Sequence, residues 1–565
     1  MKYLKSGNIG LLLLSFLLFT SQNNAQTYAK NGMVVSSDKT SSAIGATMLK
    51  KGGNAIDAAI ATAFSLAVTH PSAGNIGGGG FIVFMDSAGK VTTIDFREKA
   101  PLAASPDMYL DENGNLIEDS NHMSAKAIGV PGTVAGLYLA HQKYGKLPWK
   151  DLVQPAIDQA ENGFPFNWSL YGAAEYFSSE ENKNTFMKDY FLHENGKIPE
   201  PEELGKPPEL AKTLTLIRDN GRDGFYKGET AKKIADWMKK NDGIITKKDL
   251  KKYEAIERSP IQGSYKGYDI YSMPPPSSGG VALIEMMNLM ELADLKTMEF
   301  NSAAHLHLVA EAMRRAFADR AEHLGDPDFN PDIPIEKLTS KSFAKKRFDE
   351  IDMNRASVSD STKFGQLYDG ESTTHLSTMD AAGNAVSLTY TLEYSYGSQM
   401  GSSELGFIFN NEMGDFNPQP GVTKSNGQIG TSPNLVAPGK RMLSSMTPTI
   451  VGKNGKPYLL IGSPGGRTII NTVFQTVLNV LEFNMRIDKA IEALKIHHQW
   501  LPDQIVYEKN LLSPDTRKIL ENMGHTLRER NNMGALMGIT YDPERKVFVG
   551  ASDSSQPDSG AVGYE

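Results

Sequence analysis

Polar and hydrophobic residues alternate along residues 372–391 in a pattern that predicts one β-hairpin. The first arm is Ser372-Thr373-Thr374-His375-Leu376-Ser377-Thr378-Met379-Asp380, the second begins at Asn384, and the break between them contains Gly383. Two alternating runs around a Gly-containing break are typical of paired strands. If Asp380 pairs with Asn384 and Gly383 takes the left-handed conformation, the register places Thr373 opposite Thr391.

Hydrophobic periodicity predicts further elements on both sides of this hairpin. Strands are expected at 32–37, 81–85, 91–96 and 407–409, and hairpins at 446–461 and 539–550. Helices are expected at 44–49, 58–68, 281–292, 302–324 and 468–481, and 107–262 is expected to be mixed and largely helical. Asn54 is a favourable N-cap for the second of these helices. Because strands and helices are mixed along the chain, we predict an α+β sandwich covered by helices.

Composition narrows the class of protein. With 565 residues, 40% of them hydrophobic, the chain can bury a large core in one large or a few smaller domains. A formal charge of −8 gives no electrostatic reason to expect nucleic acid or an anionic membrane as a partner. The absence of cysteine excludes disulfides, thiol catalysis, iron–sulfur clusters and cysteine–zinc sites.

The N-terminus has the pattern of an export signal. Lys2 and Lys5 precede an apolar run over 9–19, and a polar stretch then ends at Ala25, after which we expect cleavage. The run is too short for an ordinary transmembrane helix, and no later stretch is apolar over a spanning length. The sequence therefore predicts an exported protein, periplasmic or secreted, without a membrane span in its mature form.

Two motifs that suggest metals or nucleotides have better structural explanations. The glycines at 77–80 are followed by a strand pattern and lack the Gly-Lys-Ser/Thr of a phosphate loop. His305 and His307 are two positions apart on a predicted helix, so they face different sides. We therefore predict no metal and no cofactor.

Thr373 is the candidate nucleophile. A threonine hydroxyl attacks readily only when a base takes its proton, and a threonine at a chain start carries its own α-amine for this purpose. Thr391, opposite in the hairpin, is placed to orient the hydroxyl. The structural alternative is that both are ordinary strand residues. Likewise Gly465-Gly466 before a helix can stabilise an oxyanion or form a tight turn, and Arg97 can bind a carboxylate or form a salt bridge.

The residues around Thr373 resemble a known family. Thr373-Thr374-His375, Asp380, 383–386 and Thr389-Tyr390-Thr391-Leu392 are similar to the start of the small subunit of γ-glutamyltranspeptidases, which are N-terminal nucleophile hydrolases. The similarity extends from Gly32 through Asp57, Arg97-Glu98, Asp319-Arg320 and Gly465-Gly466 to 550–553. It implies a four-layer αββα fold and self-cleavage between Ser372 and Thr373. The expected pieces are a signal peptide (1–25), a large subunit (26–372) and a small catalytic subunit (373–565), the two subunits forming one intertwined heterodimeric domain.

The resemblance also implies a set of site residues. Thr373, Thr391, Gly465 and Gly466 are expected to be catalytic. The donor's α-carboxylate is expected to bind Arg97, Ser444 and Ser445, and its α-ammonium is expected to bind Glu393, Glu412 and Asp415. This sequence departs from the common family pattern at Glu393, where many members have asparagine, at Gly414, where an aspartate is frequent, and at Asn426, near a lid tyrosine of some members.

The reaction implied is transfer of a γ-glutamyl group. The expected donors are glutathione and other γ-glutamyl compounds, and the expected acceptors are water, amino acids or dipeptides. Two related enzyme classes remain as alternatives, the cephalosporin acylases and the poly-γ-glutamate transpeptidases. A non-catalytic periplasmic γ-glutamyl-binding protein is a third alternative, against which the presence of Thr373, Thr391 and both glycines argues.

Overall fold

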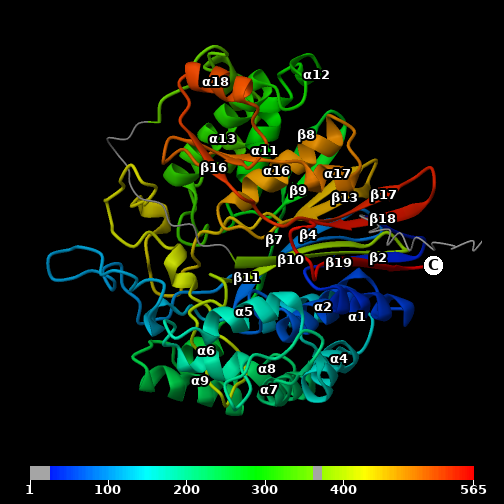
Figure 1. Ribbon diagram of the computed structural model, residues 1–565, viewed down its shortest axis with the longest axis vertical. Helices are drawn as coiled ribbons and strands as arrows, with labels where there is room; N and C mark the ends of the chain where they lie inside the picture. The colour runs from blue at the N-terminus through cyan, green and yellow to red at the C-terminus, as the bar shows by residue number, and fades with distance from the viewer. Residues whose placement is uncertain (1–25, 360–371) are drawn as a thin grey trace, which may run out of the picture.

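Two seven-stranded sheets lie face to face between two layers of helices in the computed structural model, which describes residues 26–359 and 372–565 (Figure 1). The first sheet has the order β19 (Gly560–Tyr564), β2 (Gly32–Ser36), β10 (Ser372–Asp380), β11 (Ala385–Glu393), β3 (Gly79–Met85), β4 (Val91–Asp95), β7 (Ile256–Arg258). The second has the order β1 (Thr27–Ala29), β18 (Val547–Ser552), β17 (Met537–Asp542), β13 (Lys456–Gly462), β12 (Thr449–Lys453), β9 (Tyr268–Ser272), β8 (Ile261–Tyr265). The predicted α+β class and αββα layering are confirmed.

Each outer face of the sandwich is covered by helices (Figure 1). The first sheet is covered by α1 (Lys39–Lys50), α2 (Ala55–Thr69), α3 (Thr133–Tyr144) and α4 (Trp149–Asn162), with α5 (Trp168–Ser178), α6 (Thr185–Phe191), α7 (Pro208–Asn220), α8 (Asp223–Tyr226) and α9 (Gly228–Lys240) on the same side. The second is covered by α11 (Gly279–Met290), α13 (Ala303–His323), α16 (Thr468–Leu481), α17 (Ile487–Glu492) and α18 (Pro514–Asn522).

The hydrophobic core is divided among the three spaces between these layers. Ile82 and Leu388 of the first sheet pack against the first helical layer. Val83 and Leu460 meet between the sheets. Alternating residues of one strand thus face two different cores, because successive side chains of a strand point to opposite sides.

The β10–β11 hairpin has the predicted register. Thr373 lies opposite Thr391, the Asp380 N–H donates to the Asn384 carbonyl at 3.1 Å, and Gly383 has a φ of +91°. Both strands have partners on either side, β2 beside β10 and β3 beside β11. The hairpin is therefore the centre of the first sheet, which gives Thr373 a rigid support.

Side-chain caps also fix the start of α2, as predicted. Asn54 accepts from the Asp57 N–H at 3.0 Å, and the Asp57 carboxylate accepts from the Asn54 N–H at 2.9 Å, a capping box. The Asp380 carboxylate accepts from the Ala55 N–H at 3.0 Å, so an anion stabilises the helix start. This contact joins the tip of the hairpin to α2.

The strand predicted at 407–409 is wrong. These three residues are buried, but they make only an isolated bridge between Gly401 and Ile408. Their backbone bonds are local, from Ser398 N–H to the Phe409 carbonyl and from Phe409 N–H to the Met400 carbonyl. A short, fully buried apolar run has the same composition as a buried strand, so composition alone does not show that this run lacks a neighbouring strand to pair with.

The predicted signal peptide at 1–25 and most of the segment before Thr373, residues 360–371, lie outside the described residues. Within 26–359 and 372–565, no helix is both long enough and apolar enough to cross a membrane.

Candidate active site

A cavity of about 440 Å³ lies at the open end of the β10–β11 hairpin, away from its turn. The predicted site residues that line it are Arg97, Thr373, Thr391, Glu393, Glu412, Asp415, Ser444, Ser445 and Gly466. They come from segments distant in sequence. Thr373, Thr391 and Glu393 lie on β10 and β11, Arg97 follows β4, and Glu412 and Asp415 lie on the 3-10 turn η3 (Glu412–Asp415). The fold thus brings together residues that the sequence places hundreds of positions apart.

The two threonines face each other. Thr373 Oγ1 donates to Thr391 Oγ1 at 3.3 Å, and the Glu393 N–H donates to Thr391 Oγ1 at 2.8 Å. Thr373 retains 7% of its exposed surface and Thr391 retains 3%, so the pair is nearly buried at the cavity wall. Thr391 is held by the backbone and in turn orients the Thr373 hydroxyl.

The two predicted oxyanion-binding glycines connect β13 to α16. Gly465 and Gly466 have φ values of +128° and +55°, which favour glycine. A Cβ at Gly465 would lie 2.6 Å from Thr468 Oγ1. Among the described residues, neither glycine N–H has a hydrogen-bond acceptor. Both amides are thus available near a helix start, although only Gly466 lines the cavity.

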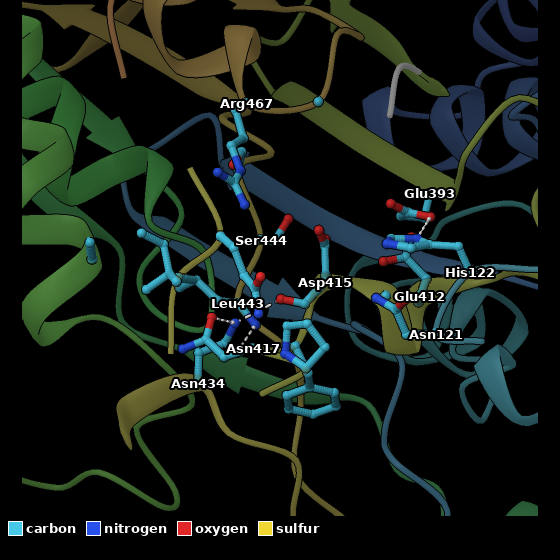
Figure 2. Close-up of a pocket in the computed structure, with 18 of the residues that line it drawn as sticks. Asn121, His122, Glu393, Glu412, Asp415, Asn417, Asn434, Leu443, Ser444 and Arg467 are labelled. Atoms are coloured by element: carbon cyan, nitrogen blue, oxygen red, sulfur yellow. Dashed lines mark hydrogen bonds and ion pairs between the residues drawn. The ribbon is translucent and has the colours of Figure 1, made fainter. Parts of the chain in front are cut away.

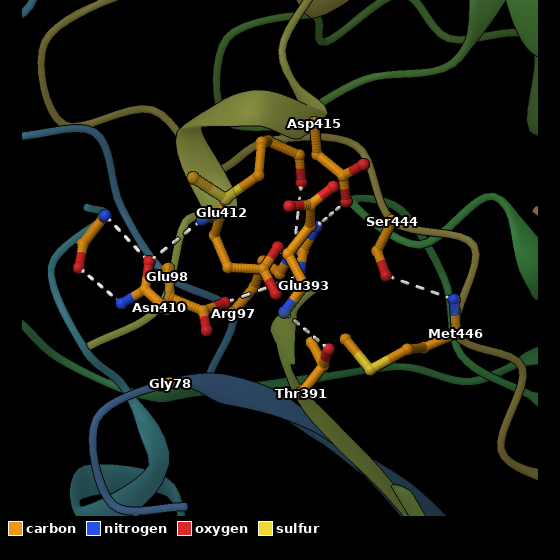
Figure 3. Close-up of polar contacts among 12 residues, drawn as sticks. Gly78, Arg97, Glu98, Thr391, Glu393, Asn410, Glu412, Asp415, Ser444 and Met446 are labelled. Atoms are coloured by element: carbon orange, nitrogen blue, oxygen red, sulfur yellow. Dashed lines mark hydrogen bonds and ion pairs between the residues drawn. The ribbon is translucent and has the colours of Figure 1, made fainter. Parts of the chain in front are cut away.

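Arg97 lies at the centre of a cluster of carboxyl groups (Figure 3). Its Nη1 is 2.5 Å from Glu412 and 3.5 Å from Glu98, and its Nη2 contacts Asp415. The sequence analysis assigned Arg97 and the acidic residues to different groups of the donor, the α-carboxylate and the α-ammonium. The structure has these side chains in direct contact, because a guanidinium that is only 1% exposed requires anions beside it.

The carboxyl groups of this cluster outnumber its cations. Burial raises the pKa of Glu412 well above its usual range, and it raises the pKa of Glu98 to about 8 despite the attraction of Arg97. Burial also raises the pKa of Glu393 to about 7, against the opposing effect of His122. Burial disfavours the Arg97 cation, but Glu412 and Asp415 outweigh it and raise its pKa. The cluster is therefore short of positive charge, a property suited to binding an ammonium group.

Ser444, the first of the two predicted serines, lies beside this cluster (Figure 2). Ser444 Oγ accepts from the Met446 N–H at 3.1 Å, and Ser445 Oγ accepts from Arg320 Nη2 at 3.1 Å. Asn434 joins the two loops, since its Nδ2 donates to the Asp415 carbonyl at 2.7 Å and its Oδ1 accepts from the Leu443 N–H at 2.9 Å. Serine hydroxyls and carboxyl groups thus share one rigid wall.

The lining residues that were not predicted from sequence include His122, Arg320 and Arg467. His122 Nδ1 lies 3.3 Å from Glu393 Oε2, and its ring stacks on Tyr394 with centroids 4.7 Å apart. No motif marks His122, which belongs to the region 107–262. Arg467 directly follows Gly466, so a cation beside the predicted oxyanion site was a usable signal.

Comparisons with known proteins identify the family of this chain. The sequence profile of the gamma-glutamyltranspeptidase family matches residues 41–563. The glutathione hydrolase proenzyme of Escherichia coli (strain K12) is 46% identical over 546 residues, covering 95% of this chain and 92% of that protein.

Solved structures agree as well. The crystal structure of Helicobacter pylori gamma-glutamyltranspeptidase has a chain 44% identical to this one, with a TM-score of 0.55 over 56% of this chain and 91% of that chain. A cephalosporin acylase from Bacillus halodurans is 25% identical with a TM-score of 0.82, covering 99% and 100% of the two chains. The protein therefore belongs to the γ-glutamyltranspeptidase family of enzymes.

Proposed function

We propose that this protein cuts its own chain between Ser372 and Thr373 and then uses Thr373 to transfer γ-glutamyl groups from glutathione or related compounds. The observation that carries the proposal is the Thr373–Thr391 contact at 3.3 Å in a cavity that is also lined by Gly466 and the carboxyl cluster. The word proenzyme in the name of the Escherichia coli relative supports maturation by cleavage.

Maturation needs only the chain itself. The Thr373 hydroxyl attacks the Ser372 carbonyl carbon, the peptide C–N bond breaks, and the Ser372 acyl group moves to the Thr373 oxygen as an ester, while the hydroxyl proton passes to the Thr373 nitrogen, which becomes an amine. Water then hydrolyses the ester. The products are a large subunit (26–372, after removal of the signal peptide 1–25) and a small subunit (373–565), which remain together as a heterodimer. Removal of the signal peptide implies export, to the periplasm or the medium.

Catalysis uses the new chain start. The Thr373 amine, with an ordinary pKa of roughly 7.7–8.0, takes the hydroxyl proton as the oxygen attacks the γ-amide carbon. Negative charge develops on the carbonyl oxygen, where the Gly465 and Gly466 N–H groups stabilise it. The amine of the leaving group receives the proton and departs, which leaves a γ-glutamyl ester on Thr373. Water, an amino acid or a dipeptide then takes the γ-glutamyl group.

Donor recognition follows from the charges of the cavity. The α-ammonium supplies the positive charge that Glu393, Glu412 and Asp415 lack. The α-carboxylate binds Arg97 with the hydroxyls of Ser444 and Ser445, a charge-assisted arrangement. Glu412 and Asp415, which contact Arg97 in the structure, are then shared between the guanidinium and the ammonium.

The high TM-score with the cephalosporin acylase favours one alternative, hydrolysis of an acyl side chain without an ammonium group. The buried carboxyl cluster argues against it, because such a substrate would leave the deficit of positive charge uncompensated. Parallel assays with a γ-glutamyl anilide and with glutaryl-7-aminocephalosporanic acid distinguish the two activities. Faster turnover of the cephalosporin would contradict the proposed donor.

Purified protein provides the direct test of maturation. We expect a denaturing gel to show two fragments, and N-terminal sequencing of the smaller one to begin Thr373-Thr374-His375. The mature protein should release the anilide from a γ-glutamyl anilide, and glycylglycine should increase the rate by acting as acceptor. A single uncut band in active material would rule out the nucleophile proposed here.

Glu393 should make donor binding depend on pH. Its pKa is raised to about 7, so its carboxyl is neutral below that pH and anionic above it. Because the anion attracts the donor's ammonium, the KM for the donor should fall as the pH rises through about 7. Glu393→Asn should remove this step, which measurement of KM and kcat separately from pH 5.5 to 8.5 checks.

A second variant serves as the control for this assignment. The His122 partner favours the Glu393 carboxylate, so His122→Asn should move the step in KM to higher pH. Glu393 has a φ of +81°, which asparagine adopts more readily, so Glu393→Asn should not lose stability. A KM that is independent of pH in the wild type would contradict the role of Glu393.

A further inference from the structure

Arg320 differs from the other buried arginines of the described chain. Arg97, Arg314, Arg315 and Arg441 each form an ion pair with a buried or half-buried carboxylate. Arg320 is 9% exposed and, within 26–359 and 372–565, forms no ion pair. A buried charge without a counterion is costly, so its retention beside a cavity suggests that an anionic ligand completes it.

Two serines hold the Arg320 guanidinium in place. Its Nε donates to Ser278 Oγ at 2.9 Å and its Nη2 donates to Ser445 Oγ at 3.1 Å. Ser278 is fully buried and its hydroxyl donates to the Ser444 carbonyl at 2.7 Å, so this support is itself fixed. Neutral hydroxyls orient the cation without neutralising it.

Arg467 brings a second cation to the same cavity. Its Nη1 donates to the Gly427 carbonyl at 3.1 Å, and Figure 2 shows its side chain pointing from its loop toward Ser444. Burial, followed by the positive charge of Arg467, lowers the pKa of Arg320 to about 9, with Asp415 opposing. Two guanidinium groups that repel each other across a cavity create a site for an anion between them.

We propose that Arg320 and Arg467 form an anion subsite that binds the carboxylate of the leaving group, which in glutathione is the glycyl carboxylate. The inference rests on the proposed function, because the position of the leaving group follows from Thr373 as the nucleophile. It adds a determinant of donor choice to the γ-glutamyl recognition by Arg97, and the two adjoin at Ser445, which Arg320 contacts.

The position of Arg467 selects this carboxylate over the α-carboxylate of the donor. Arg467 is the next residue after Gly466, whose N–H is assigned to the reacting carbonyl, so its side chain starts beside the bond that breaks. A Cys-Gly leaving group extends from that bond by about 7 Å, since an extended residue spans roughly 3.3–3.6 Å. An arginine side chain reaches a similar distance, and its fork fits a carboxylate.

Two donors that differ only in the leaving-group carboxylate test the subsite. We compare kcat/KM for glutathione with kcat/KM for its C-terminal amide. The wild type should prefer glutathione by about ten- to a hundredfold, the effect of one charge-assisted hydrogen-bonded contact. In Arg467→Gln this preference should fall to about one- to threefold, and Arg320→Gln should reduce it as well.

Lys424→Gln is the matched control, because Lys424 is an exposed cation at the rim of the same cavity. It should keep the wild-type preference. An equal loss of the preference in Lys424→Gln would show that the summed positive charge of the cavity, and not a specific subsite, attracts the carboxylate. A wild type without preference for the carboxylate would overturn the subsite even if no variant folds. If the wild type turned over neither donor, the proposed function would fail first, so the two failures are distinguishable.

Discussion

Thr373→Ala should yield a single uncut chain with no measurable γ-glutamyl transfer. The substitution removes the hydroxyl that we propose both attacks Ser372 and serves as the nucleophile of the mature enzyme, and removing a nucleophile costs on the order of 10⁶ in kcat. Fold and stability should change little, because the Thr373 side chain makes a single hydrogen bond, at 3.3 Å, to the part of the chain that the structure describes. A denaturing gel and an assay with a γ-glutamyl anilide measure both effects.

Two neighbouring variants control for strand disruption. Thr373→Ser keeps the hydroxyl, so it should still mature, more slowly, because serine is less restricted about χ1. Thr374→Ala removes the adjacent hydroxyl, which bonds Ser37 Oγ at 2.6 Å on the opposite face of the strand. It should cost about 1 kcal/mol of stability and leave cleavage intact. Maturation of Thr373→Ala would refute self-cleavage by this residue.

Arg97→Met should have the second largest effect, on stability and on donor binding together. The variant leaves the buried Glu98 and Glu412 without their cation, and breaking a buried pair costs about 3–5 kcal/mol. The raised pKa values of both carboxyls allow them to bind protons, so part of this loss should be recovered below pH 7. Denaturant unfolding at pH 5.5 and pH 8 measures the difference.

Arg97→Lys distinguishes the effect of the positive charge from the effect of the two parallel N–H groups of the guanidinium. It keeps a cation for the carboxyl cluster, so most of the stability should return. It cannot offer two parallel N–H groups to the donor's α-carboxylate, so kcat/KM should remain roughly a hundredfold below the wild type. Wild-type kcat/KM in Arg97→Lys would show that Arg97 is structural and that the α-carboxylate binds elsewhere.

The register of the hairpin was predictable because it depends on local features. The period of two and the position of Gly383 are both contained in twenty residues, and together they place Thr373 opposite Thr391. The capping box of Asn54 and Asp57 was predictable for the same reason. Such signals involve residues within a few positions of one another, so no knowledge of the tertiary fold was needed.

The electrostatics of the cavity could not be predicted in this way. Arg97 and Asp415 are 318 positions apart, and their contact depends on how β4 and η3 end beside each other. The sequence placed Arg320 on a helix, yet its lack of a counterion among the described residues is a property of the surrounding loops. His122 lies in a region without a recognisable motif, so only the structure connects it with Glu393.

The strand order of the first sheet also bears on what happens after the chain is cut. From one edge to the other, strands of the proposed small and large pieces are interleaved, with β2 held between β19 and β10. Pulling the pieces apart would break three ladders of backbone hydrogen bonds in this sheet, namely β19–β2, β2–β10 and β11–β3. Neither piece contains all the strands of either seven-stranded sheet. The cut therefore frees the chain end at Thr373, while the two pieces together still unfold as one cooperative unit.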